Sequence, residues 1–326
     1  MIEILLKEWI EQVKYYIHLI ADYSIKESQV GAVLDDVLNL SGKMLRSKLL
    51  LLCAFLGSNW KNNKEKICKL AAMVELTHLA SLIHDDIVDD SPYRRGKVSI
   101  QGKYGKDAAV FAGDFLIARI FYYGAVENLN EAVSILSKTV EYMCIGEIEQ
   151  DLCRYQEDIS EKKYFENIER KTAALFQAAS YIGAKEAGCS EEIIQKLELF
   201  VKNLGLMFQL KDDILDFTSN SKELGKETHK DFQNGIYTFP VIMALKNPEA
   251  KEVLLPIMRK NKEEKLSLAE ILQLQNYIIQ FGGIEASYEK IKYLSNINRQ
   301  LIKELGQNSK ITVYLEKILN DLEVEN

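Results

Sequence analysis

The chain has 326 residues, 47% of them hydrophobic and 27% charged, a composition that is ordinary for a soluble globular protein. Its formal net charge of -7 at pH 7 disfavours a nucleic-acid partner, because phosphate backbones are bound by broad basic surfaces. Its five cysteines include no Cys-x-x-Cys pair, which predicts buried, reduced thiols in a cytoplasmic protein.

The predicted elements are helices separated by short breaks. Residues 1–23 carry charges at regular intervals among apolar residues, which predicts an amphipathic helix rather than a signal peptide. The longest apolar run, 49–56, is too short to cross a bilayer, so we expect no transmembrane segment. Proline is absent from 1–91 and from 93–239, and long proline-free stretches with helical spacing favour helices. Breaks are expected at Gly42, 57–59, 91–92, 102–105, Gly188 and 247–248.

No Gly-, Ser- or Pro-rich linker divides the chain. We therefore predict one all-α domain over residues 1–326, with long apolar helices in its core. The charged segment 251–326 is expected to form amphipathic helices packed outside that core. Asn247 is expected to cap one of them, with Pro248 at the first helical position.

One acidic motif occurs twice, each time in apolar sequence. Residues 85–90 are Asp-Asp-Ile-Val-Asp-Asp and residues 212–216 are Asp-Asp-Ile-Leu-Asp. On a helix, residues four apart share a face, so each motif aligns its first aspartate with a later one. Clustered carboxylates repel one another and resist burial, so they need a cation. Oxygen ligands select hard cations, and Mg2+ completes its shell with water and phosphate. If the two helices face each other, the motifs predict a site for Mg2+ and a diphosphate.

Basic residues near these motifs supply the charges that a diphosphate needs. Four pairs of basic residues occur there. A single such pair is more often solvated at the surface, but the four together, in an acidic protein, indicate an anion site. They are Lys43 and Arg46, Arg94 and Arg95, Arg170 and Lys171, and Lys226 and Lys230. Residues 170–172 are expected to open an apolar helix.

Together these motifs resemble the trans-isoprenyl diphosphate (polyprenyl) synthase family. The likeness covers nearly all the chain and is densest over 42–245. It rests on both acidic motifs, the Arg94-Arg95-Gly96 segment and the loop residues 224–226, 230–231 and 238–240. The resemblance implies a bundle of antiparallel helices around a deep central cavity. It also implies head-to-tail condensation of isopentenyl diphosphate onto an allylic diphosphate, such as farnesyl or geranyl diphosphate.

The resemblance implies a role for each matched residue. The Mg2+ ligands would be Asp85, Asp89 and Asp212, supported by Asp86, Asp213 and Asp216. Isopentenyl diphosphate would be bound by Lys43, Arg46, His78 and Arg95. The allylic diphosphate would be bound by Arg94, Lys171, Thr172, Gln209 and Lys226, of which the two lysines are also expected to serve catalysis.

The loop after the second motif departs from the family pattern. Many members have lysine after the glycine of this loop, where this chain has Gly235-Ile236. One cation contact to the allylic diphosphate is therefore missing or replaced. We expect Lys226 and Lys230 to carry more of that task.

Product length is expected to depend on the turns just upstream of Asp85. Short-chain members of the family place aromatic residues there, whereas this chain has Thr77, Ala80 and Ser81. Small residues predict an open tunnel and a medium or long product, hexaprenyl to octaprenyl diphosphate; the plain alternative is close helix packing.

The family also implies partners. It is usually homodimeric, and residues 146–150 with 170–173 resemble the catalytic subunit of bacterial heptaprenyl and hexaprenyl synthases, some of which need a small dissimilar partner. Peripheral membrane contact during release of a quinone side-chain precursor is a further expectation.

Three other functions compete. A short-chain farnesyl or geranylgeranyl synthase is the nearest alternative. A terpene cyclase is disfavoured because cyclases usually carry a different second metal motif. A non-catalytic subunit is disfavoured because such subunits lack one aspartate motif, and both are intact here.

Overall fold

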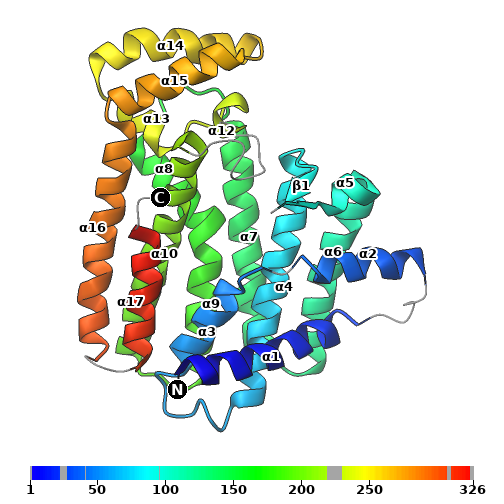
Figure 1. The fold of residues 1–326 in the computed structure, drawn as a ribbon. Coiled ribbons are helices and arrows are strands. Elements are labelled where there is room, and N and C mark those ends of the chain that lie inside the picture. Colours follow the sequence, from blue (N-terminus) through cyan, green and yellow to red (C-terminus); the bar gives the residue numbers. More distant parts are fainter. Residues whose placement is uncertain are drawn as a thin grey trace. The chain divides into compact units, whose positions relative to one another are not determined.

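The computed structural model describes residues 2–22, 28–40, 42–94, 96–218, 230–306 and 310–323. These residues are mostly helical, with one short two-stranded hairpin, which confirms the all-α prediction (Figure 1). They pack into two compact units. The first unit comprises Met1–Val140 and Leu175–Leu199, and the second comprises Glu141–Ala174 and Phe200–Asn326. The extent of the predicted domain, 1–326, stays a prediction.

Among the described residues, the first unit contains six helices and one two-stranded hairpin of its own, and parts of three helices shared with the second unit. Its own elements are α1 (Ile2–Ile20), α2 (Gln29–Leu38), α3 (Leu45–Ala54), α4 (Lys64–Val88), α5 (Ile100–Tyr104), α6 (Lys106–Val126) and the hairpin of β1 (Tyr93–Arg94) with β2 (Lys97–Val98). The shared helices are α7 (Asn130–Leu152), α9 (Ala174–Glu186) and α10 (Glu191–Thr218).

Helix α4 is the central element of the first unit. Apolar side chains surround most of it, so it is buried by α1, α3 and α6 rather than on one face only. A methyl group added at Gly113 of α6 would meet the ring of His84, and one added at Gly124 would meet Met73. These two contacts occur in opposite order along the two helices, so α4 and α6 are antiparallel.

The predicted N-terminal helix is confirmed as α1, which buries Leu6, Trp9, Val13 and Ile17, spaced three or four residues apart on one face. The apolar run 49–56 forms the buried part of the short core helix α3 and the turn after it.

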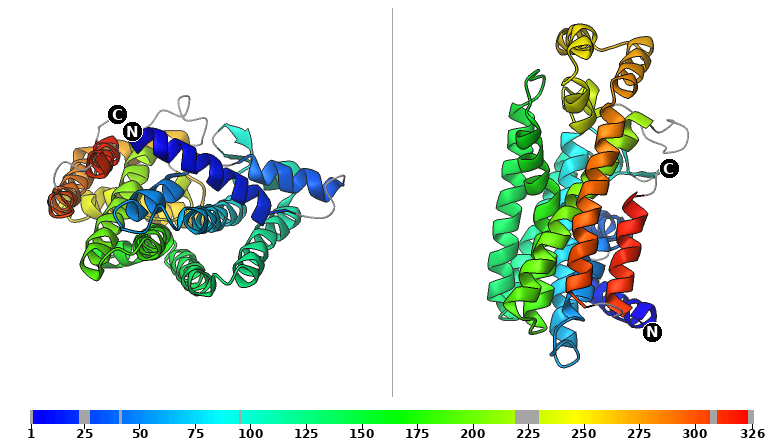
Figure 2. Two further views of the ribbon diagram at one scale, coloured as in Figure 1. Left: turned by 90° about the horizontal axis from the view of Figure 1, so that it is seen from below. Right: turned by 90° about the vertical axis from the view of Figure 1, so that its left-hand side faces the viewer.

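The second unit holds the remaining helices. They are α8 (Glu161–Ile168), η1 (Glu169–Ala173), α12 (Lys230–Gln233), α13 (Phe239–Ala244), α14 (Pro248–Glu263), α15 (Leu268–Gln280), α16 (Gly283–Glu304) and α17 (Lys310–Glu323). Helices α16 and α17 lie side by side in both Figure 1 and Figure 2. The predicted cap is confirmed: the Asn247 side chain accepts from the Glu249 N–H at 2.9 Å, with Pro248 opening α14.

Three local expectations were wrong in detail. The break expected over 102–105 is confined to Gly105, since α5 continues through Gly102. The segment around Lys171 does not open an ordinary helix but forms the π-helix η1. All five cysteines are free thiols, but Cys144 is exposed and only two are buried.

Helices α4 and α6 are long and apolar enough to cross a membrane. Within the protein, 72% of the apolar window of α4 and 39% of that of α6 are buried, and the core helix of a soluble protein has the same composition. The expected lack of a transmembrane segment stays a prediction.

Candidate functional site

The first acidic motif lies at the end of α4. Asp85 is in the last turn and Asp89 caps the helix, one turn further on, and both side chains are half-buried. The chain then turns sharply through Asp90, which has a left-handed φ of 48°. The two carboxylates predicted to bind Mg2+ from this motif therefore share one face of the helix end.

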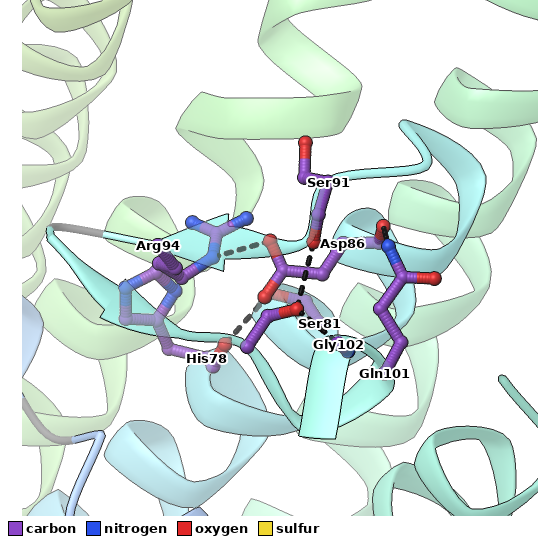
Figure 3. Close-up of polar contacts among 8 residues, drawn as sticks. His78, Ser81, Asp86, Ser91, Arg94, Gln101 and Gly102 are labelled. Atoms are coloured by element: carbon purple, nitrogen blue, oxygen red, sulfur yellow. Dashed lines mark hydrogen bonds and ion pairs between the residues drawn. The ribbon is translucent and has the colours of Figure 1, made fainter. Parts of the chain in front are cut away.

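Asp86 has a different environment from its neighbours. It is buried, and its carboxylate accepts from Arg94 Nε at 2.7 Å (Figure 3). Its backbone carbonyl accepts from Gln101 Nε2 at 2.5 Å and from the Ser91 N–H at 2.9 Å. Asp86 thus ties the segment after α4 back to the helix and holds Arg94. Its carboxylate serves this local structure.

Two of the predicted isopentenyl diphosphate contacts lie together in the first unit. Arg46 Nη1 is 2.9 Å from His78 Nε2, and because a guanidinium only donates, the histidine nitrogen accepts. The Arg46 guanidinium also stacks over the Phe176 ring, with its central carbon 4.5 Å from the ring centroid. Lys43 is exposed, just before α3. The predicted cluster of Lys43, Arg46 and His78 therefore stands at the junction of α3 and α4.

The predicted chain-length residues lie on the preceding turns of α4. Thr77 and Ala80 are buried, and Ser81 is half-buried. The Thr77 hydroxyl donates to the Met73 carbonyl at 2.9 Å and the Ser81 hydroxyl to the His78 carbonyl at 2.8 Å, so both are satisfied within the helix. A pocket of about 190 Å³ lies beside the other end of α4, against Leu70. The open tunnel stays a prediction.

The second motif lies on α10 in the second unit. Asp212 is exposed and Asp216 half-buried, whereas Asp213 is buried. The Tyr164 hydroxyl donates to Asp213 Oδ2 at 2.5 Å, and Gln209 Nε2 donates to Asp213 Oδ1 at 2.9 Å. Burial raises the pKa of the Asp213 carboxyl to about 7, with a further contribution from nearby carboxylates, while the two donors act in the opposite direction.

The hydrogen-bond chain at Asp213 includes two further predicted residues and one that was missed. The Thr172 hydroxyl donates to Gln209 Oε1 at 2.8 Å, which links η1 to α10. Tyr164 was not predicted as a site residue. The only signal that could have indicated Tyr164 is that a buried tyrosine hydroxyl needs a polar partner. In the structure, burial raises the pKa of Tyr164 well above its usual value.

The π-helix η1 presents Lys171 and Arg170 to two carboxylates of α7. Lys171 Nζ lies 3.0 Å from Glu147, and Arg170 pairs with Glu149. Gly146 permits this close approach, since a methyl group there would lie 3.0 Å from the Lys171 nitrogen. Short π-helices often occur at functional sites, because the wider turn redirects side chains. The Gly146-Glu147-Ile148-Glu149 segment therefore has a defined role in supporting the basic residues.

The remaining predictions fall on the loop after the second motif and on one arginine. Arg95 and Lys226 lie outside the described residues. Lys230 opens α12 and is half-buried. Gly235 has a φ of +74°, and a methyl group there would lie 2.6 Å from the Tyr155 ring, so glycine is required.

The two motifs, each described within its own unit, share one arrangement. The second aspartate of each is buried and hydrogen-bonded, while the first and last lie one turn apart on a more accessible face. Within the part of the chain that the structure describes, no three His, Cys, Asp or Glu side chains form a complete metal-ligand group. Each motif offers a pair of carboxylates one helical turn apart. Such a donor set fits Mg2+, which retains water and phosphate ligands.

Comparison with known proteins identifies the family. The polyprenyl synthetase family model matches residues 27–275. Heptaprenyl diphosphate synthase component 2 of Geobacillus stearothermophilus is 35% identical over 265 residues, which cover 80% of this chain and 80% of that protein. A polyprenyl synthase from Caulobacter crescentus CB15, solved with calcium and isoprenyl diphosphate, superposes with a TM-score of 0.88 at 29% identity and covers 99% of this chain and 96% of that one.

Heptaprenyl diphosphate synthase from Staphylococcus aureus superposes with a TM-score of 0.86 at 26% identity, covering 98% of each chain. The fold class expected from the motifs is therefore confirmed. This chain belongs to the polyprenyl synthetase family.

Proposed function

We propose that the protein is a prenyltransferase that condenses isopentenyl diphosphate head-to-tail onto an allylic diphosphate, yielding a medium- or long-chain all-trans polyprenyl diphosphate for a quinone side chain. The observation that carries the proposal is the shared arrangement of the two acidic motifs. In each, one aspartate is anchored inside the protein and two others are presented one turn apart. The heptaprenyl synthase relatives support the product class.

Asp85 and Asp89 of the first motif would hold Mg2+, and so would Asp212 of the second, with Asp216 in support. The ion, when bound, would neutralise negative charge on the departing diphosphate. Calcium in the related Caulobacter structure supports the use of a divalent cation. Mg2+ is our choice because open pairs of carboxylates suit it.

The basic residues divide into two groups. Arg46, His78 and Lys43 would bind the diphosphate of the isopentenyl substrate, through a guanidinium that His78 and Phe176 hold in place. Lys171 and Thr172 of η1 would bind the allylic diphosphate and stabilise its charge as it leaves. The isopentenyl double bond then attacks the allylic carbocation, and a proton is lost to the released diphosphate. Water must be kept out, because it would trap the cation.

A partner subunit is part of the proposal. The Geobacillus relative is named as component 2 of its enzyme, which supports assembly with a dissimilar small subunit. A homodimer is the alternative assembly. We further propose a cytoplasmic protein that contacts the membrane peripherally when it releases its apolar product.

The test supplies farnesyl diphosphate, labelled isopentenyl diphosphate and Mg2+ to the purified protein, with and without a candidate small subunit. We expect label in an apolar product after dephosphorylation. We expect Asp212→Asn to reduce it by at least 100-fold (about 2.7 kcal/mol or more), whereas Asp158→Asn, at an exposed aspartate of the same unit, should not. Absence of incorporation under both conditions would overturn the proposal.

A further inference from the structure

Helix α3, which carries Arg46 in its first turn, begins without a cap of its own. Its N-cap residue, Met44, has a left-handed φ of 52° and makes no side-chain capping hydrogen bond. The first backbone hydrogen bond of the helix runs from the Lys48 N–H to the Met44 carbonyl. The N–H of Ser47 therefore precedes the helical ladder and needs an acceptor from elsewhere.

Glu75 of α4 supplies that acceptor. Its carboxylate Oε2 lies 2.8 Å from Ser47 Oγ and 3.4 Å from the Ser47 nitrogen. Glu75 is only 6% exposed and Ser47 is fully buried. A carboxylate at a helix N-terminus also interacts favourably with the helix dipole, and the effect is strongest where water is excluded. Helix α4 thus caps α3 from the side.

Helices α3 and α4 also meet through a second pair of residues. This pair lies one residue away from Ser47 on α3 and about one turn away from Glu75 on α4. His78 follows Glu75 by three residues on α4 and so lies on the same face. It contacts Arg46, which is adjacent to Ser47, at 2.9 Å. Ser47 and Arg46, neighbours on α3, therefore each contact a residue of this α4 face, and Ser47 Oγ also lies 3.0 Å from the Ala71 carbonyl of α4.

Packing alone does not account for this glutamate. A buried carboxylate is costly to desolvate, and an apolar side chain of similar volume often stabilises a core better. Glu75 instead lies one turn from His78 on α4. It also contacts the N-terminal turn of α3, the helix that carries Arg46.

We propose that Glu75 is a positioning residue for the isopentenyl diphosphate site. By capping α3 it holds Arg46, and Lys43 just before the helix, in the geometry that binds the substrate diphosphate. This inference rests on the proposed function and extends it to a residue that does not itself touch the substrate.

Steady-state kinetics of four variants test this role. Glu75→Met keeps the side-chain volume but removes the acceptor, and should raise KM for isopentenyl diphosphate about tenfold (~1.4 kcal/mol). KM for the allylic substrate should change less than twofold. Glu75→Gln retains an acceptor oxygen and should largely restore KM. Ser47→Ala should raise the same KM about threefold. Ile67→Val, at a fully buried residue two turns away on α4, is the packing control and should change neither KM.

Equal changes in both KM values, or an unchanged KM for isopentenyl diphosphate in Glu75→Met and Ser47→Ala, would overturn the positioning role. If Glu75→Met does not fold, Ser47→Ala decides by the same criterion. Calorimetric binding of isopentenyl diphosphate to wild type and variants keeps the two proposals separate. A wild-type protein that binds this substrate but makes no polymer would overturn the proposed function alone.

Discussion

Asp86 and Arg94 form an ion pair that is largely buried, with Arg94 Nε 2.7 Å from Asp86 Oδ1. The Asp86 side chain is 3% exposed and the Arg94 side chain 17% exposed. The pair joins α4 to the hairpin that follows it (Figure 3). It also separates the roles within the first motif, since Asp86 is bound to an arginine while Asp85 and Asp89 occupy the other face.

Removing one partner of this pair should be costly. Asp86→Ala leaves a largely buried guanidinium without its carboxylate, so we expect the free energy of unfolding to fall by about 3 kcal/mol. Lys106→Ala is the matched control, because Lys106 pairs with Asp90 at the surface and should contribute under about 1 kcal/mol. Denaturant unfolding measures both values. Equal losses would show that the Asp86–Arg94 pair has no special structural role.

Tyr164→Phe should weaken the support of the second motif. Above about pH 7, where the Asp213 carboxyl is ionised, the variant removes a 2.5 Å hydrogen bond to a buried carboxylate, and a hydrogen bond to a charged group contributes about 1.5–3 kcal/mol. We expect a loss of about 2 kcal/mol in unfolding free energy. Tyr237→Phe in the same unit removes a 3.4 Å bond to a neutral carbonyl and should cost less than half as much. The account of Asp213 is wrong if the two variants are equivalent.

Gly235→Ala should be more disruptive than the same change at a glycine of similar backbone conformation. Both Gly235 and Gly282 have a positive φ, which costs an alanine about 1–2 kcal/mol. At Gly235 the new methyl group also meets the Tyr155 ring, whereas at Gly282 nothing lies within 4 Å. Thermal unfolding should therefore show a clearly larger decrease in Tm for Gly235→Ala. An equal decrease would mean that the ring moves aside at little cost.

Glu270 provides a pH-dependent contribution to stability. Lys260 and Ser267, which binds Glu270 in a capping box, lower the pKa of this carboxyl from 4.5 to about 2. A lowered folded-state pKa stabilises the protein above the unfolded-state value, and that gain is lost as the pH falls from about 4.5 to about 2. Glu270→Gln should therefore lower Tm at pH 7 and differ progressively less from wild type in that interval. A Tm difference that stays constant with pH would contradict this assignment.

Ser81→Phe and Ala80→Phe should shorten the product. Ala80 is buried and Ser81 half-buried on the turn just upstream of the first motif, so an added ring would obstruct any tail that runs along α4. We expect the main product to lose two or more isoprene units, as seen by chromatography of the dephosphorylated products. Tyr142→Phe, at an exposed position on α7, is the control. Unchanged lengths in both variants would disprove the tunnel.

Local patterns in the sequence predicted the elements that local interactions determine. The spacing of apolar residues located α1, and Asn247-Pro248 located the start of α14, because amphipathic periodicity and capping depend on residues within one or two turns. The acidic motifs predicted which carboxylates share a helix face for the same reason.

Contacts between distant residues could not be predicted in this way. Nothing near Lys171 in the sequence signals a π-helix, and the Lys171 backbone approaches Gly146, which lies 25 positions earlier in the chain. Tyr164 and Glu75 each bond to a residue at least 28 positions away, so their partners emerge only when the helices pack. For Glu75 the available signal was a lone carboxylate in an apolar stretch.

The length of the product tests the central proposal most directly. Wild-type protein, with its small subunit if one is required, receives farnesyl diphosphate, excess labelled isopentenyl diphosphate and Mg2+, and the dephosphorylated products are separated by chain length. We predict all-trans products in the hexaprenyl to octaprenyl range. Unextended farnesyl primer, products that stop at geranylgeranyl length, or a cyclic hydrocarbon formed without isopentenyl diphosphate would contradict it.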